Sequence, residues 1–232
     1  PRPLRQRHYF WANSAVPARD DLHLVYPCNR ARTLGGEWPY PIVNGRDMSW
    51  YRNHERPNDI FALDAQDDFF GCYYGGLDAG LVHWADHRLD FGKKFFTWGT
   101  ADEGMIWVDL LTDEDGQYVE MQSGRFVDQS TFDFLFPYQT VGWCEYWYPL
   151  SGMGGFAWAN DRAALDLRLG EGMAEVAALV NTGSGQGQLT LTVSGRLAWQ
   201  ELVDLAPGRG VRRTVPLPGV EREAPASLSL LM

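Results

Sequence analysis

The sequence predicts an all-β fold, and three observations support this prediction. Short runs of aromatic and β-branched residues are separated by Gly, Asp and Pro, a pattern typical of strands joined by turns. Further along the chain, apolar and polar residues alternate with a period of two, as in strands that bury one face. Helical patterns are brief, and we expect short helices only at residues 104–111 and 130–134.

The N-terminal part of the chain holds the aromatic strand candidates. They are residues 22–26, 81–83, 95–98, 118–121 and 143–148. Turns are expected at Asn44-Gly45, at Asp115-Gly116 and at residues 152–155, because Asn, Asp and Gly adopt turn conformations at low cost. These turns would connect neighbouring antiparallel strands.

From residue 161 onward the strand pattern is regular. Apolar residues occupy alternate positions, or run continuously, at residues 165–169, 176–180 and 189–193. We expect the Gly-rich residues 181–187 to form a hairpin connection and residues 206–208 to form a turn. The predicted organisation is an aromatic-rich part, residues 1–160, followed by residues 161–232, which either begin a second β domain or close the first.

The aromatic residues and histidines are unevenly distributed. Every aromatic residue except Trp199 lies at or before Trp158, and all five histidines lie in the same stretch. We therefore expect a functional site in this first part. Aromatic rings beside hydrogen-bonding side chains suit flat, hydroxylated ligands such as sugars, whose C–H faces pack on rings while their hydroxyls need directed partners.

Composition and charge limit the classes of function. The formal net charge of −10 argues against nucleic acid and anionic membrane surfaces as partners, because both require an excess of Lys and Arg. Cys28, Cys72 and Cys144 form no C-x-x-C pair, so neither a zinc knuckle nor a redox dithiol is predicted. No cofactor is expected. The odd cysteine number favours a cytoplasmic location, with secretion left open.

The two ends of the sequence suggest a fragment. The chain does not begin with Met, and residues 227–232 form an apolar run that resembles the middle of a strand. We expect an open sheet edge to be covered by self-association or by a missing neighbouring segment.

His83 and His87 form the first candidate constellation. They are four residues apart, so the spacing predicts that they share one face of the local element. Two adjacent imidazoles can donate to sugar hydroxyls or transfer protons near neutral pH. The equally weighted alternative is a polar pair satisfied by backbone groups. A metal site is not predicted, because Asp86 would point elsewhere in a strand.

Polar residues at strand positions form the second candidate group. Glu120 and Gln122 should face the same side of their strand, near Arg125, as a polar floor for a polyol. The competing interpretation, that they lie on the wet side of an ordinary sheet, is favoured by the pattern alone. Of Lys93 and Lys94, at most one can point into a cleft, and the other is expected to be solvated.

A third group lies on the next predicted strand. Glu145 is expected beside the indoles of Trp143 and Trp147, where a carboxylate would adjoin two aromatic rings. Tryptophans that could serve as stacking platforms are Trp11, Trp84, Trp98, Trp107 and Trp147, although most large aromatics fill the core.

Dense motifs between Tyr9 and Asn160 resemble the DUF5107 family of uncharacterised bacterial proteins. The motifs are Tyr9-Phe10-Trp11-Ala12-Asn13, Val16-Pro17, Asp59-Ile60-Phe61-Ala62-Leu63, Asp68-Phe69-Phe70-Gly71, Gly92-Lys93-Lys94, Thr97-Trp98-Gly99, Leu111-Thr112-Asp113-Glu114-Asp115-Gly116, Tyr118-Val119-Glu120, Gln122-Ser123-Gly124-Arg125 and Glu145-Tyr146-Trp147-Tyr148-Pro149. Members often carry tetratricopeptide repeats downstream. Their domain is similar to galactose mutarotase and to the small-chain domain of β-galactosidase.

The resemblance implies an antiparallel β supersandwich with a carbohydrate-facing cleft, here incomplete. In mutarotases a Glu removes the anomeric proton and a His protonates the ring oxygen, so Glu120 resembles the base, and His83 or His87 the acid. The implied binding residues are Gln122, Arg125, Glu145, Trp98, Trp147 and Lys94. Family members usually have a long preceding segment that completes the cleft, so little activity is expected of this piece alone.

Three hypotheses about function follow. The leading one is a carbohydrate-recognising β domain of a larger bacterial protein of sugar metabolism. The second is an enzyme that acts on aldoses or glycosides, in which Glu120→Gln would abolish turnover and leave sugar affinity largely intact. The third is a structural module without a ligand, whose aromatic sheet docks against another segment or chain.

Overall fold

A computed structural model describes residues 6–8, 11–33 and 35–232 of the chain. Strands make up 52% of the structure and helices 8%, which confirms the all-β prediction. Tyr9 and Phe10, the first residues of the family-like motifs, lie outside the described residues. Among the described helices, none is long and apolar enough to cross a membrane.

The chain packs as two compact units that are each discontinuous in sequence. Unit 1 comprises Pro1–Phe70 and Ala85–Glu145, and unit 2 comprises Gly71–Trp84 and Tyr146–Met232. The domain boundary expected near residue 160 stays a prediction.

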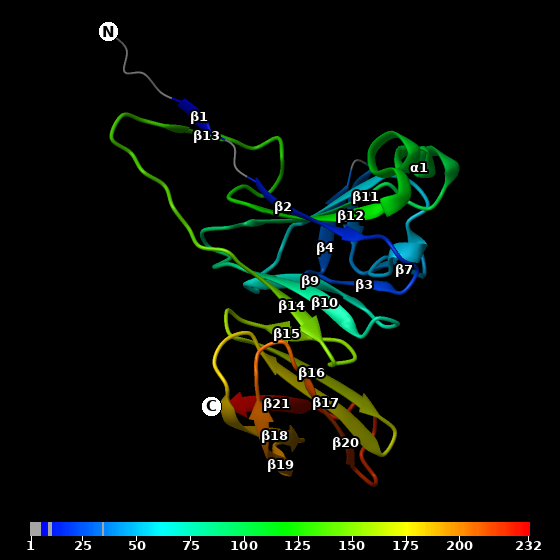
Figure 1. Ribbon diagram of the computed structural model, residues 1–232, viewed down its shortest axis with the longest axis vertical. Helices are drawn as coiled ribbons and strands as arrows, with labels where there is room; N and C mark the ends of the chain where they lie inside the picture. Colours follow the sequence, from blue (N-terminus) through cyan, green and yellow to red (C-terminus); the bar gives the residue numbers. More distant parts are fainter. Residues whose placement is uncertain (1–5, 9–10, 34) are drawn as a thin grey trace. The chain divides into compact units, whose positions relative to one another are not determined.

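Unit 1 is built on a six-stranded antiparallel sheet (Figure 1). Its strands, in spatial order, are β2 (Trp11–Pro17), β12 (Tyr118–Gly124), β11 (Gly92–Thr97), β8 (Asn58–Ala62), β4 (Arg30–Thr33) and β5 (Gly36–Pro39). The register places Gln122 opposite Lys94 and Glu120 opposite Phe96. Because side chains alternate along each strand, these residues share one face of the sheet.

The opposite face of this sheet forms the core of unit 1. Ile60, Phe95 and Met121 come from adjacent strands on this face, and all three are fully buried. The rings of Tyr26 and Phe70 meet the ring of Phe95 edge-on, at centroid distances of 4.9 Å and 5.5 Å, respectively. The rings of Tyr26 and Phe70 are tilted relative to each other. The aromatic residues of the N-terminal part therefore fill a core as well as line a surface.

Short elements complete unit 1. They are β1 (Gln6–His8), β3 (Leu22–Val25), β6 (Ile42–Val43), β7 (Arg46–Asp47), α1 (Asp102–Trp107) and β13 (Asp133–Leu135). β6 and β7 form a hairpin whose turn residues, Asn44 and Gly45, have φ values of 50° and 78°, which confirms the predicted turn.

The two helix predictions had different outcomes. Residues 104–111 fall within α1 and the irregular helical turns that follow it, so a brief helix is confirmed there. Residues 130–134 form no helix, since Asp133 begins β13, which pairs with β1. The helix prediction for this second segment was wrong because pairing with a distant strand outweighed the weak local preference.

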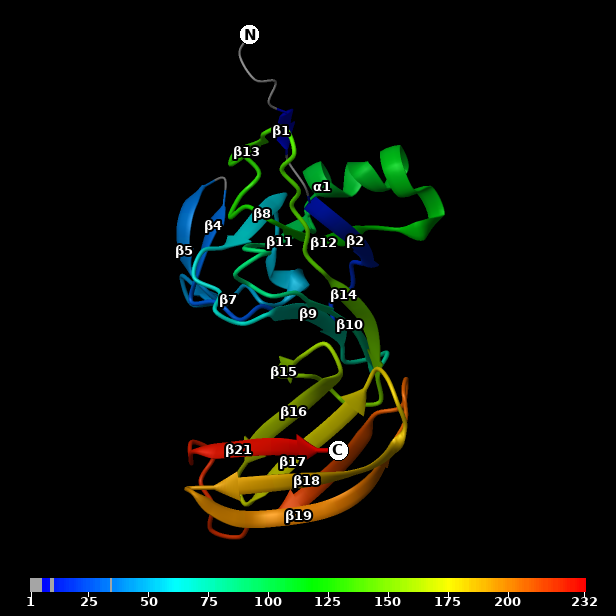
Figure 2. The same ribbon diagram turned by 90° about the vertical axis from the view of Figure 1, so that its left-hand side faces the viewer.

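Unit 2 contains a β-sandwich, and in Figure 2 its strand β21 crosses in front of β16 and β17, which belong to the other sheet. One sheet has the order β15 (Trp158–Ala159), β16 (Ala163–Gly170), β17 (Met173–Val180), β20 (Val211–Pro216). The other has the order β19 (Arg196–Leu205), β18 (Gly185–Val193), β21 (Ala226–Leu231). The alternating apolar residues meet between the sheets, where Ala178, Leu189 and Leu191 are fully buried. This unit also holds β10 (Ala79–Trp84), which pairs with β14 (Tyr146–Ser151), and the residues of β9 (Phe69–Tyr74) from Gly71 onward.

Residues 181–187 do not form the predicted hairpin. β17 pairs with β16 and β20, whereas β18 pairs with β19 and β21, so the segment between them crosses from one sheet to the other. The prediction was wrong because glycine-rich sequences fit both kinds of connection. The turn at residues 206–208 is confirmed: Ala206 bridges to Arg209, and Gly208 has φ 73°.

Candidate functional site

The candidate site is the polar face of the six-stranded sheet in unit 1. Asn13 of β2, Glu120 and Gln122 of β12, Lys94 of β11 and Asp59 of β8 occupy corresponding positions of four adjacent strands. Their side chains therefore lie on one face, opposite to the face of Phe95. We call this surface, together with Gln129 from the loop after β12, the polar face.

Glu120 accepts two hydrogen bonds on one of its carboxylate oxygens. Asn13 Nδ2 donates to Glu120 Oε2 at 3.2 Å, and Gln122 Nε2 donates to the same oxygen. Gln129 Nε2 in turn donates to Gln122 Oε1 at 2.9 Å. The side chain of Glu120 is only partly buried, and its Oε1 accepts no hydrogen bond from the described residues. This oxygen is available to accept a bond from a ligand hydroxyl.

Lys94 extends the network on the other side of Gln129. Its Nζ donates to Gln129 Oε1 at 2.9 Å and forms an ion pair with Asp59 Oδ1 at 2.5 Å. The side chain of Lys94 is 4% exposed, so both partners offset the cost of burying its charge. Its ammonium also lies 5.0 Å and 5.5 Å from the ring centroids of Phe61 and Phe96.

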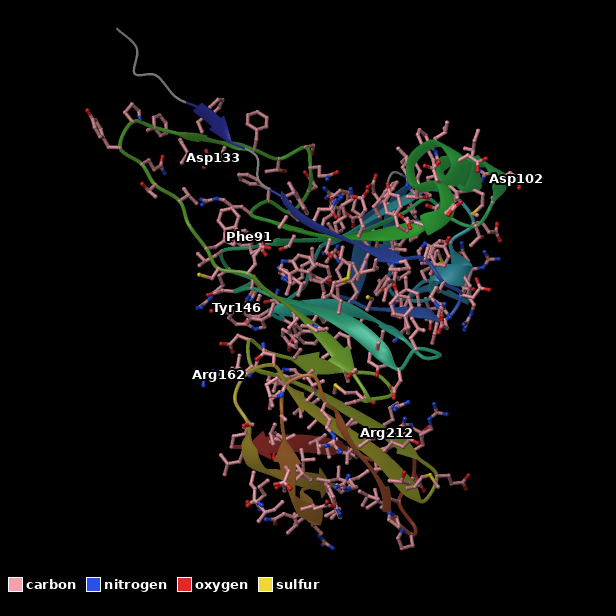
Figure 3. All side chains as sticks on the ribbon, in the orientation of Figure 1. Phe91, Asp102, Asp133, Tyr146, Arg162 and Arg212 are labelled. Atoms are coloured by element: carbon pink, nitrogen blue, oxygen red, sulfur yellow. The ribbon has the colours of Figure 1, made fainter. Side chains whose placement is uncertain are left out.

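Aromatic rings lie near both ends of β11; Figure 3 labels Phe91, the residue before this strand, and Asp102, the first residue of α1. Just beyond one end, Trp98 stacks on Trp107 with ring centroids 4.5 Å apart and meets Phe96 edge-on at 4.8 Å. At the other end, Trp11 meets Phe61 edge-on at 6.0 Å. A ligand on the polar face would therefore lie between two groups of aromatic rings.

Gly104 of α1 is required for the stack of Trp98 on Trp107. A Cβ at residue 104 would lie 2.0 Å from the backbone oxygen of Trp98, and backbone atoms cannot move aside easily. We predict that Gly104→Ala displaces α1 and lowers the free energy of unfolding by about 1–3 kcal/mol, although alanine is the better helix former.

Near-ultraviolet circular dichroism and urea denaturation would test the Gly104 prediction. The signal of the stacked indoles should weaken in Gly104→Ala. Gly142→Ala is the control, because a Cβ at Gly142 meets no atom within 4 Å. An unchanged spectrum and unchanged stability in Gly104→Ala would contradict the prediction.

Arg125 and His87 lie outside the polar-face network. Arg125 follows the last residue of β12 and, with His87, lines a separate cavity of about 570 Å³ in unit 1. His87 Nδ1 lies 2.7 Å from Asp68 Oδ1. Arg125 was predicted to lie near Glu120 and Gln122. Among the described residues, it forms no hydrogen bond with either of them.

His83 and His87 do not share a strand face. β10 ends at Trp84, so the alternation that would bring His87 to the side of His83 stops three residues short of it. His83 belongs to unit 2 and His87 to unit 1. The prediction that the two imidazoles form a pair was wrong, because it assumed one regular element from His83 to His87 and the strand ends before His87.

The remaining predicted site residues are not members of the polar-face network. His83 is fully buried and sits directly opposite Trp147 of β14, with the ring centroids 4.6 Å apart. Glu145 precedes β14 and accepts a hydrogen bond from Trp143 Nε1 at 2.7 Å. The predicted contact of this carboxylate with one of the indoles is thus confirmed.

Lys93 points to the opposite side of the sheet from Lys94, as the strand spacing predicted, but it is not solvated. Lys93 is fully buried, and its Nζ has no hydrogen-bond partner among the described residues. Burial lowers the pKa of Lys93, and the carboxylate of Asp90 opposes this effect. Burial also raises the pKa of Asp90 to about 6, while Ser123 Oγ donates a hydrogen bond to its carboxylate.

Three members of the polar face were missed by the sequence predictions. Asn13 and Asp59 lie within the family-like motifs and on strands, so the alternation of residues could have identified them. Gln129 carried no such signal, because it lies in a loop that folds back over β11 and β12.

The chain is similar to a solved structure of a TPR-domain containing protein from Parabacteroides distasonis ATCC 8503. The two share 27% sequence identity with a TM-score of 0.52, and the match covers 63% of this chain and 25% of the other. The chain thus spans about a quarter of the length of that protein. The model of a domain of unknown function, DUF5107, matches residues 1–150 and so includes the strands of the polar face. The chain therefore belongs to the DUF5107 family.

Proposed function

We propose that the polar face binds a saccharide and that the chain is a carbohydrate-recognising part of a larger protein. The observation that carries this proposal is the continuous hydrogen-bond network from Asn13 through Glu120, Gln122 and Gln129 to Lys94. In this network, hydrogen bonds already hold the amide side chains in place around a carboxylate. A polyol would therefore bind with a smaller loss of side-chain entropy.

The aromatic rings complete the chemistry that a sugar requires. The C–H groups of a pyranose face pack on an aromatic ring, while its hydroxyls need hydrogen-bond partners. Trp98 and Phe96 at one end, and Trp11 and Phe61 at the other, adjoin the polar face. Lys94 adds no net attraction for anions here, because its ion pair with Asp59 neutralises it. A neutral sugar therefore fits this face better than a charged one.

Binding accounts for the polar face better than catalysis does. A mutarotase-like reaction would use Glu120 as base and a histidine as acid. The hydrogen bonds that Glu120 accepts come from the amides of Asn13 and Gln122, while His87 is hydrogen-bonded to Asp68. The galactose mutarotase-like relationship and the supersandwich arrangement remain part of the proposal.

Titration of the protein with D-glucose, D-galactose and their β-linked disaccharides, followed by two-dimensional NMR, tests the proposal. We expect weak binding that perturbs the amide signals of residues 94, 98, 120 and 122. Gln122→Ala should weaken binding about tenfold, because it breaks the network and leaves polar groups unpaired. Trp98→Ala should weaken it to a similar extent. Gln200→Ala, an exposed amide of unit 2, is the matched control.

Two results would contradict the saccharide proposal. One is the absence of binding by the folded protein at about 50 mM of every sugar, where even a Kd in the millimolar range should be seen. The other is binding that neither Gln122→Ala nor Trp98→Ala weakens. Polarimetry of fresh α-D-glucose separates binding from catalysis: acceleration of anomer exchange that Glu120→Gln abolishes would support the enzyme instead.

A further inference from the structure

A second site is suggested by the cavity next to Arg125. Its volume of about 570 Å³ lies within the range of small-molecule sites. Apolar side chains form part of its wall, namely Leu63, Phe91, Phe126 and Val127. It differs from the polar face, because none of Glu120, Gln122 or Lys94 lines it.

The ionisable side chains that line this cavity are all basic, although the chain as a whole is acidic. The formal net charge of the protein is −10, yet His87, Arg88 and Arg125 line the cavity and no carboxylate of the described residues does. Arg88 is already engaged, because its Nε and Nη2 donate to the two oxygens of Asp86 at 2.8 Å and 2.6 Å. Arg125 forms no ion pair with a described residue and therefore offers its guanidinium donors to a ligand.

His87 is held in place by Asp68. The Oδ1 atom of Asp68 accepts hydrogen bonds from the backbone N–H of His87 at 2.9 Å and from its Nδ1 at 2.7 Å. With Nδ1 engaged, Nε2 is the ring nitrogen left for a ligand, and it donates to a ligand oxygen when both ring nitrogens carry protons. An Arg and an oriented imidazole beside an apolar wall are the groups that recognise an oxyanion on a small organic molecule.

A metal ion explains these residues less well. Asp68, Asp86 and His87 bring ligand atoms to within 4.8 Å of one another. However, both oxygens of Asp86 accept bonds from Arg88, and Asp68 Oδ1 accepts two from His87. A cation would have to displace these donors and would also lie near the guanidinium of Arg88. The carboxylates therefore serve to position the basic side chains.

We propose that this cavity binds a small organic anion, a carboxylate or a phosphate monoester. Its oxyanion would accept hydrogen bonds from Arg125 and from the imidazolium form of His87, and its carbon skeleton would pack against Phe91 and Phe126. The guanidinium plane of Arg125 suits either group, because both present two oxygens at a spacing that a bidentate contact can match. The site is independent of the saccharide site on the polar face.

Calorimetric titration with benzoate, phenyl phosphate and the neutral benzyl alcohol tests this assignment. The two anions should bind, and benzyl alcohol should bind at least about tenfold more weakly, because it lacks the charge-assisted hydrogen bonds. The anion that binds with the higher affinity shows whether the site prefers a carboxylate or a phosphate monoester. Binding of benzyl alcohol that equals that of both anions would overturn the proposal, and so would the absence of binding by all three compounds.

Three variants locate the binding. Arg125→Gln should weaken anion binding about tenfold or more, and Arg125→Lys should restore part of the loss, because lysine keeps the charge without the planar fork. Arg19→Gln is the charge-matched control, since Arg19 pairs with Asp21 and lines none of the cavity. Thermal unfolding verifies that each variant is folded. Unweakened anion binding in a folded Arg125→Gln variant would overturn the proposal.

The two proposed sites can fail separately. Gln122→Ala and Trp98→Ala should leave phenyl phosphate binding unchanged, and Arg125→Gln should leave saccharide binding unchanged. If Arg125→Gln weakens the binding of neutral sugars as much as that of anions, Arg125 serves the saccharide and the second site is refuted.

Discussion

Replacing Phe95 by alanine should lower the free energy of unfolding by about 3–5 kcal/mol. Phe95 is fully buried on β11, and Tyr26 and Phe70 meet its ring edge-on at centroid distances of 4.9 Å and 5.5 Å. Removing the ring takes away its transfer free energy and leaves a cavity, which the surrounding rings cannot fill without losing these edge contacts. We expect the loss to appear in the urea-induced unfolding transition.

Phe91 provides the control for Phe95. It lies one residue before the same strand and is 55% exposed, so Phe91→Ala should change the unfolding free energy by no more than about 0.5 kcal/mol. Phe95→Leu should fall between the two, since leucine fills part of the volume. A loss under about 1 kcal/mol in Phe95→Ala would mean that the face of β11 opposite to Lys94 is not the core of unit 1.

The stability of unit 1 should fall as the pH rises through about 6, because of Asp90. Burial first, and then the charge of Glu145, raise the folded-state pKa of Asp90 to about 6, whereas Ser123 and Lys93 oppose the shift. In the unfolded chain the carboxyl has a pKa near 4. A carboxyl whose pKa is raised by folding contributes stability below its unfolded pKa and loses it as the pH rises through the folded value. The loss amounts to about 3 kcal/mol between pH 4 and pH 7.

Asp90→Asn should remove this pH dependence. The amide stays neutral, and its oxygen can still accept the hydrogen bond from Ser123 Oγ. The free energy of unfolding of Asp90→Asn should therefore exceed that of the wild type by an amount that increases from pH 4 to pH 7. Asp67→Asn, at an exposed neighbouring carboxylate, should leave the profile of the wild type unchanged. Parallel profiles for Asp90→Asn and the wild type would contradict the prediction.

Local pattern predicted several of the central strands of the protein. The aromatic or alternating runs around residues 22–26, 81–83, 95–98 and 118–121 coincide with β3, β10, β11 and β12. The run 143–148 becomes a strand only from Tyr146 onward. Strand boundaries depend on where partner strands end, which the local sequence does not encode.

Within the candidate site, the sequence predicted contacts along one strand better than contacts between segments. Glu120 and Gln122 were expected on one face because alternation is a property of a single strand, and their hydrogen bond bears this out. Gln129 could not be predicted, because a loop brings it to Lys94 over 35 positions. His87 was predicted on the same face as His83, but β10 ends at Trp84, before His87.

The sequence by itself determined that this protein is all-β, belongs to the DUF5107 family and has Glu120 and Gln122 on one side of a strand. Only the tertiary structure decided that Lys94 is paired with Asp59, that Lys93 is buried and that Arg125 turns away to a basic cavity beside His87. The physical reason is that periodicity fixes the direction of a side chain relative to its own backbone. Burial and partners depend on which distant segments pack against that side chain.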